Sequence, residues 1–184
     1  MDPATFPYRN YFLLSARVVL AWTLYRYGYG KLTDAQFGVD EKTMNMALKD
    51  IDLFRVSWYL ADHQPFKAFI GISQIICALL LTFNKTLIIG AFVSIPIWLN
   101  ILMWDLTFMG GMTVAFTFRL SYYIILTIMI LYHQKDKVLP AILLVTETKP
   151  SVKFPLWTYA MLPFSAIGIE LIGAIPNAIL YYLR

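Results

Sequence analysis

Few residues in this chain carry a thiol or an imidazole, and their scarcity excludes several kinds of site. The 184 residues include one cysteine, Cys77, and two histidines, His63 and His133. A single cysteine rules out a disulfide relay within the chain. His63 stands at the start of one apolar stretch and His133 at the end of another, so we expect them on opposite faces of the membrane. The membrane thickness of about 30 Å would then keep them too far apart to bind one haem or one zinc ion.

The chain also lacks a glycine-rich phosphate-binding motif or a dinucleotide fingerprint. We therefore expect no metal and no cofactor bound within the chain. Any redox chemistry would use a diffusible quinone or a partner subunit.

Charged residues are scarce as well, at 14% of the chain, whereas 59% of the residues are hydrophobic. The net charge of +4 comes from scattered lysines and arginines rather than a basic block, so we predict no binding to nucleic acid. The apolar residues gather in five stretches, each close to the roughly 20 residues that cross a bilayer. These stretches are 11–30, 65–83, 87–104, 114–132 and 157–183.

The five stretches predict an all-α polytopic membrane protein, folded as a helical bundle in a lipid bilayer. We expect a single transmembrane domain over residues 1–184, with a core at 11–137, an outer loop at 31–64 and an extra C-terminal span at 157–183. The first stretch contains two arginines and has no small-x-small cleavage site, so we interpret it as a retained span.

The distribution of lysines predicts the orientation. The loop at 84–86 contains Lys85 and the segment 133–156 contains four lysines, whereas residues 105–113 contain no lysine or arginine. Because positive residues concentrate in cytoplasmic loops, we predict a cytoplasmic N-terminus in a bacterial cytoplasmic membrane. The 31–64 loop is then outside, although it also carries positive charges.

Within this outer loop, apolar residues recur every three or four positions from 41 to 61, which is typical of one amphipathic helix. Trp58 and Tyr59, near its end, suit the head-group layer. Two interpretations stay open: a lid packed on the outer mouth of the bundle, and a helix that docks a partner.

Ionisable residues inside the spans form the most informative pattern. A charge at mid-membrane costs about 3 kcal/mol on insertion scales, so such residues usually face protein. At a rise of about 1.5 Å per residue, four polar residues from three spans fall in one layer of the outer leaflet, with three more just above it. The four are Arg26, Asn100, Asp105 and Arg119, and the three above are Lys31, Asp62 and His63.

Two interpretations of this layer are open. In one, Arg26 and Arg119 tie helices together by pairing with Asp105 and Asn100. In the other, the arginines line an outward-facing pocket, and their excess of positive charge attracts a small anion or a quinone head group.

Three polar residues lie outside the layer. Gln74 and Glu170 fall near the midplane, where they could form a hydrogen-bonded pair with Glu170 neutral, or Glu170 could carry a proton. Arg17, near the inner end of the first span, is expected to extend toward the cytoplasmic head groups.

Three segments resemble the DoxX-like family of membrane proteins. The end of the first span, RYGYGKL at 26–32, resembles that family's G-x-x-K-L ending. The second span, GISQIICALLL at 71–81, is similar to its G-x-x-E-x-x-x-A-x-L-L helix. A short basic loop at 84–86 and a small-residue start to the third helix at 89–91 follow in the same order. The resemblance covers about 11–137.

This resemblance implies a four-helix membrane core with an outer loop between the first two helices, extended here by a fifth C-terminal helix. The family takes its name from the DoxD/DoxX small subunit of thiosulfate:quinone oxidoreductase. Gln74 occupies a position where many relatives carry glutamate. Because of this difference, a role that requires a carboxylate at this position is not carried over to this chain.

The expected function is an accessory or small-subunit role in a membrane complex, with a diffusible quinone as a candidate ligand. Its partners would be other membrane proteins or further copies of the chain. A stand-alone oxidoreductase or carrier for a small anion or quinone is one alternative, and a purely structural subunit is another. Whether the chain is an enzyme stays open.

Overall fold

The structure is a computed structural model that describes residues 8–147 and 154–182, apart from the side chains of Met112, Ala174 and residues 176–182. The chain divides into two units, residues 1–142 and residues 143–184. All secondary structure in the described residues is helical. The predicted all-α fold class is thereby confirmed.

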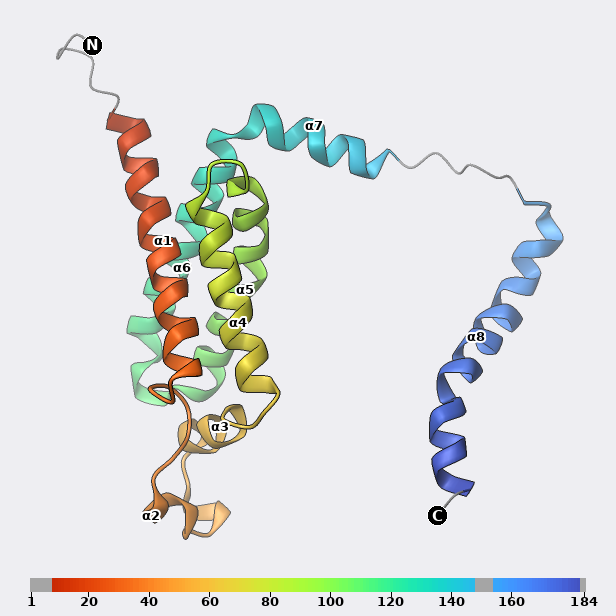
Figure 1. The fold of residues 1–184 in the computed structure, drawn as a ribbon, viewed down its shortest axis with the longest axis horizontal. Coiled ribbons are helices and arrows are strands. Elements are labelled where there is room, and N and C mark those ends of the chain that lie inside the picture. Colours follow the sequence, from red (N-terminus) through yellow and green to blue (C-terminus); the bar gives the residue numbers. More distant parts are fainter. Residues whose placement is uncertain (1–7, 148–153, 183–184) are drawn as a thin grey trace. The chain divides into compact units, whose positions relative to one another are not determined.

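The first unit is a four-helix bundle, shown in Figure 1. Its long helices are α1 (Tyr8–Leu32), α4 (Phe66–Thr82), α5 (Leu87–Phe108) and α6 (Thr113–His133). α1 packs on α4, α4 on α5, α5 on α6, and α6 on α1, so the ring closes. We call the end where α1 stops and α4 starts the loop end. The opposite end, where α6 leads into α7 (Lys135–Thr146), is the α7 end.

Large apolar side chains and close backbone approaches together form the core. Leu20, Leu24 and Trp98 are completely buried. A Cβ atom added to Gly28 would lie 2.5 Å from the carbonyl oxygen of Gly71, so only glycine allows α1 to pack this closely on α4. Small residues at such contacts are typical of helix packing in membranes.

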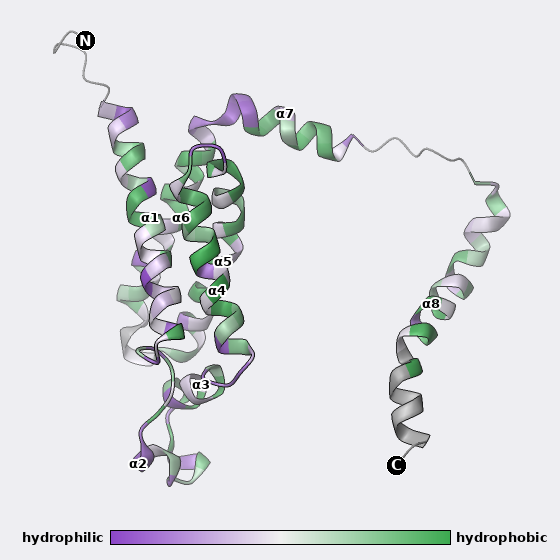
Figure 2. Ribbon diagram, viewed as in Figure 1, coloured by the Kyte–Doolittle hydropathy of each residue, from purple (hydrophilic) through white to green (hydrophobic). Residues whose placement is uncertain are grey.

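Figure 2 shows hydrophobic residues along much of α4 and α5, and many large hydrophobic side chains of the four long helices are exposed. Among the described residues, α5, α6 and α8 (Leu156–Tyr182) are long and apolar enough to cross a membrane. α3 (Leu53–Ala61) and α4, bent by 82°, would together make a fourth span. A multi-pass membrane protein is therefore confirmed.

α1 does not meet the same criterion, because two arginines and several tyrosines interrupt its apolar residues. Its 25 residues are long enough to reach across a bilayer at about 1.5 Å per residue. It packs against α4 and α6 as one of the four helices of the bundle. The predicted count of five spans stays a prediction for this helix.

The second unit contains the last residues of α7 and the helix α8, which corresponds to the predicted span 157–183. Pro163 lies inside α8 without ending it. The prediction that residues 1–184 form one transmembrane domain stays a prediction.

The prediction of one helix over residues 41–61 is wrong. The segment forms α2 (Glu41–Met44), a single 3-10 turn at Leu48–Asp50, and α3. Asp52 has an extended backbone and its side chain accepts a hydrogen bond from the Arg55 amide, so it starts a new helix instead of continuing the old one. Asp40 starts α2 in the same way through Thr43, and these hydrogen bonds hold the pKa of Asp40 below its usual value. An apolar repeat of three or four therefore misled because two aspartates act as N-caps.

The broken segment is fixed to the bundle at both of its ends. Lys67, at the start of α4, is 5% exposed and forms ion pairs with Asp34, just after α1, and with Asp62, just after α3. The Gly38 amide donates to the Trp58 carbonyl oxygen at 3.1 Å. α3 also packs on α5, which agrees with the lid interpretation. The docking interpretation stays a prediction.

Arg17 has partners within the protein that the sequence did not predict. Its guanidinium donates hydrogen bonds to the carbonyl oxygens of Leu81 and Thr82 and to the side-chain oxygen of Asn84. The last carbonyl groups of a helix have no partner within that helix. Arg17 of α1 therefore caps α4, and its extension toward the head groups stays a prediction.

Candidate functional site

At the loop end, polar side chains from three different helices interact electrostatically. Lys31 lies in the last turn of α1, Asp105 near the end of α5, and Arg119 in the second turn of α6. Asp105 is 8% exposed and interacts electrostatically with both Arg119 and Lys31. We call these three residues, together with Tyr27, the loop-end cluster.

Lys31 is held within the protein by neutral groups. Its ammonium group donates to the side-chain oxygen of Gln36 at 2.9 Å and to the Tyr27 carbonyl oxygen at 3.4 Å. It also lies 5.5 Å from the centre of the Tyr27 ring and 5.0 Å from that of Phe37. With only 5% of the residue exposed, its charge depends on protein partners.

Arg119 makes its recorded hydrogen bond to the Tyr27 hydroxyl group. Its guanidinium carbon lies 5.9 Å from the centre of the Tyr27 ring and 5.6 Å from that of Phe116. Arginine stacks readily on aromatic rings in this way. Tyr27 therefore contacts both cations of the cluster, Lys31 through its carbonyl and ring and Arg119 through its hydroxyl.

Asp105 makes no direct ion pair. Among the described residues, the ion pairs within 4 Å involve Arg55 and Lys67 only, and the Asp105 carboxylate accepts no recorded hydrogen bond. The predicted tie between Arg119 and Asp105 is thus wrong as a direct contact, because Arg119 turns to Tyr27 instead. Asp105 therefore attracts Arg119 and Lys31 only through space. Its carboxylate oxygens accept no recorded hydrogen bond.

The other residues of the predicted layer lie elsewhere. Arg26 and Asn100 are exposed, with no recorded hydrogen bond or ion pair to Asp105 or Arg119. His63 is exposed and its Nδ1 pairs with the Tyr59 carbonyl oxygen at 2.9 Å. Depth along the helix was the only basis for grouping these residues. One position around a helix is about 100°, so Arg26 points away while Tyr27 points into the cluster.

The sequence analysis missed Tyr27, which belongs to the cluster, and Gln36, which contacts Lys31. A signal for Tyr27 was present: Tyr27 and Lys31 are four positions apart, which places them on one helix face. Gln36 follows the end of α1 in an irregular segment, where no periodic pattern could indicate its contact with Lys31.

Four buried side-chain atoms have no hydrogen-bond partner among the described residues: the side-chain oxygen of Gln74, the indole nitrogens of Trp98 and Trp104, and the hydroxyl oxygen of Thr117. Gln74 is 1% exposed and Trp98 is fully buried. Trp98 packs on Tyr123 with ring centres 5.0 Å apart. Glu170 is exposed within the second unit, so its predicted pairing with Gln74 stays a prediction.

No group of three or more potential metal ligands among histidine, cysteine, aspartate and glutamate occurs in the described part of the chain. The cluster offers different chemistry: N–H and O–H donors on one side and one carboxylate on the other. Such a set can hold a ligand that carries oxygen acceptors.

Comparison with known proteins adds one relative. A protein of Bacillus subtilis (strain 168), named Uncharacterized protein YwoB, is 31% identical over 88 residues, which are 47% of this chain and 56% of that protein. The chain therefore matches just over half the length of this curated relative. No family model and no solved structure match the chain.

Proposed function

We propose that this chain is a DoxX-like accessory or small subunit of a membrane complex, and that its loop-end cluster holds the head group of a quinone. The observation that carries the proposal is the arrangement of Lys31, Arg119 and Tyr27 around Asp105. These are three donor-bearing side chains beside a carboxylate with no direct partner.

The chemistry of a quinone suits these groups. Each quinone carbonyl oxygen accepts hydrogen bonds, and Lys31, Arg119 and Tyr27 carry N–H or O–H donors. Reduction of a quinone to a quinol takes up two electrons and two protons. Asp105, which interacts with Arg119 and Lys31, could pass on the two protons one after the other and take up each replacement from water, and the proposal assigns delivery of the two electrons to a partner subunit. The partner would be another membrane protein, and a homo-oligomer is the alternative.

The bilayer supports this assignment, because a quinone dissolves in lipid and because Asp105 and Arg119 lie on α5 and α6, which are apolar enough to cross a membrane. The lysine distribution supports a cytoplasmic N-terminus in a bacterial membrane, with the loop end outside. A reporter fused after Lys137 should then stay in the cytoplasm. Export of that reporter would reverse the assignment of the two ends.

A small anion is the second candidate ligand. Two cations, Lys31 and Arg119, surround one acid, Asp105, which leaves one positive charge in excess. An oxyanion such as thiosulfate or sulfite would match this excess and would use the same donors.

Thermal unfolding of the purified protein in detergent tests both ligands. A ligand that binds only the folded state raises the unfolding midpoint. We expect a short-chain quinone analogue to raise the midpoint of the wild type and of the control Arg26→Gln, but not that of Arg119→Gln. Arg26 is the matched control because it is next to Tyr27 in the chain, is exposed and makes no recorded contact with the cluster.

The outcomes separate the alternatives. A shift with thiosulfate or sulfite but not with the quinone analogue would replace the quinone with an anion at the same site. Equal shifts in Arg119→Gln and the wild type would remove the cluster as the binding site. Gentle extraction followed by size analysis tests the subunit role, because a chain that always migrates alone as a monomer contradicts it.

A further inference from the structure

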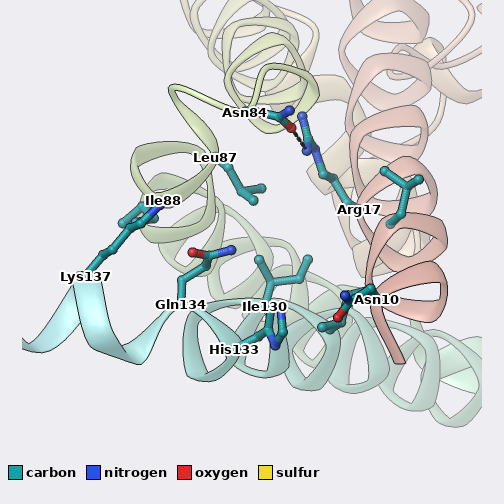
Figure 3. A pocket seen from close by; sticks show the side chains of 11 residues that line it. Asn10, Arg17, Asn84, Leu87, Ile88, Ile130, His133, Gln134 and Lys137 are labelled. Atoms are coloured by element: carbon teal, nitrogen blue, oxygen red, sulfur yellow. Dashed lines mark hydrogen bonds between the residues drawn. The ribbon is translucent and has the colours of Figure 1, made fainter. Parts of the chain in front are cut away.

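A second site lies at the α7 end, away from the loop-end cluster. A cavity of about 280 Å³ opens there between the start of α1, the loop after α4, and the junction of α6 with α7. Its polar lining, shown in Figure 3, consists of Asn10, Arg17, Asn84, His133, Gln134 and Lys137. We propose that this α7-end pocket binds the phosphate group of an anionic ligand. This proposal does not depend on the proposed quinone site.

The pocket has positive charge without a local counter-charge. Arg17 and Lys137 line it, and no aspartate or glutamate does among the residues described. The three recorded partners of Arg17 are two carbonyl oxygens and an amide oxygen, all of them neutral. The charge of Arg17 is therefore left for a ligand.

Arg17 is also held in place before any ligand arrives. A guanidinium group has five N–H donors, and three hydrogen bonds to Leu81, Thr82 and Asn84 fix its plane. The remaining donors can meet a phosphate, which arginine binds through paired N–H groups. Because the side chain is already ordered, binding loses little conformational entropy.

The opposite side of the pocket supplies more donors. In Figure 3, Lys137, Gln134 and His133 come from the end of α6 and the start of α7, across from Arg17 and Asn84. The side chains of Lys137, Gln134 and His133 make no recorded hydrogen bond or ion pair within the described structure. A phosphate between the two sides would join α1 to the α6–α7 junction.

The remaining lining is apolar and includes Leu13, Leu14 and Ile130. A pocket of this kind at the end of membrane helices suits the phosphate of an anionic phospholipid, since basic pockets between such helices bind lipid head groups. Free inorganic phosphate presents the same chemistry without the acyl chains. The shared ligand group is the phosphate, and the experiment separates its two sources.

The test is a thermal-unfolding titration of the full chain in detergent with three probes. The probes are a short-chain phosphatidylglycerol, the diacylglycerol of the same acyl length, and inorganic phosphate. The variant is Lys137→Gln, because Lys137 is exposed and makes no recorded contact that folding would lose. Lys135→Gln is the matched control, since Lys135 starts the same helix but does not line the pocket.

We expect phosphatidylglycerol to raise the midpoint of the wild type and of Lys135→Gln, and diacylglycerol to leave it unchanged. Loss of one lysine should raise the half-saturating concentration about fivefold in Lys137→Gln. Equal potency of inorganic phosphate identifies a free anion as the source, and a shift with the lipid alone identifies a head group. No shift with either phosphate probe, an equal shift with diacylglycerol, or equal titrations of Lys137→Gln and the wild type would overturn the proposal.

Discussion

The two ends of the four-helix unit each use an arginine from inside a helix, but in different ways. At the α7 end, Arg17 gives its hydrogen bonds to the carbonyl oxygens that end α4 and to Asn84. At the loop end, Arg119 gives its recorded hydrogen bond to a side chain, Tyr27, and stacks on aromatic rings. Arg17 is held beside the α7-end pocket by neutral oxygen atoms that it keeps when a ligand binds, whereas Arg119 can exchange its tyrosine partner for a ligand. The partners of each arginine, more than its depth along the helix, separate the two arrangements.

Both ends depend on the close packing of α1 on α4, so the largest effect should follow from widening it. In Gly28→Ala the new Cβ atom would lie 2.5 Å from the Gly71 carbonyl oxygen, and backbone would have to move. We expect a loss of about 3 kcal/mol, the upper part of the range for overpacking, measured as a lower unfolding midpoint in detergent.

Gly30→Ala is the matched control for that change. Its Cβ atom would have the Gln36 side chain as its nearest neighbour, at 3.8 Å, which is ordinary contact. Alanine is also the better helix former, so this variant should unfold at or slightly above the wild-type midpoint. Equal losses in the two variants would contradict the close contact between α1 and α4.

The next largest effect should come from the cap at the α7 end. Arg17→Gln leaves the carbonyl oxygens of Leu81 and Thr82 without their donor. We expect a loss of about 2 kcal/mol from the missing charge-assisted hydrogen bonds. Arg26→Gln, at an exposed position of the same helix, should cost less than about 0.5 kcal/mol.

Arg17→Lys sharpens the comparison of charge with geometry. Lysine keeps the positive charge but lacks the planar fork that reaches several acceptors. Its unfolding midpoint should therefore lie between those of Arg17→Gln and the wild type. A midpoint equal to that of the wild type would show that charge alone is required at this position.

The sequence was sufficient to predict the long helices but not to predict which side of each helix faces its neighbours. Long apolar runs predicted α4, α5, α6 and α8 to within a few residues, because a bilayer imposes both length and composition. The same runs hold no signal for which side of a helix faces its neighbours, since lipid and protein interior are equally apolar. Arg26 was therefore grouped with Arg119, although Tyr27 is the residue of α1 that reaches it.

Contacts between distant segments were also beyond sequence reasoning. The partners of Arg17 lie more than sixty positions away, and they are mostly backbone atoms that leave no trace in a side-chain pattern. Asp52 gave an ambiguous signal, because an aspartate suits both the polar face of a long helix and the N-cap of a new one. Only the folded chain decides between these.

At the loop end, the contact of Arg119 with Tyr27 should give a smaller, measurable coupling. Unfolding midpoints of Tyr27→Phe, Arg119→Gln and the double variant form a double-mutant cycle. Because the two side chains share one hydrogen bond, we expect a coupling of about 1 kcal/mol. The corresponding cycle of Tyr27→Phe with Arg26→Gln should show none. Strict additivity in both cycles would mean that the hydrogen bond contributes nothing to stability.

The smallest effects should come from Asp105, which attracts both cations without touching either. Lys31 is 5% exposed and therefore poorly screened, whereas Arg119 is exposed. A through-space attraction weakens as water and salt screen it. We therefore expect the cycle of Asp105→Asn with Lys31→Met to give a larger coupling than the cycle with Arg119→Gln. The coupling energy in the cycle with Arg119→Gln should be about 0.5 kcal/mol, which is typical of exposed pairs. Added salt should lower the Arg119 coupling more than the Lys31 coupling. If the Arg119 coupling were the larger one, Asp105 would interact mainly with Arg119. Lys31 would then be stabilised by Gln36 and the aromatic rings alone.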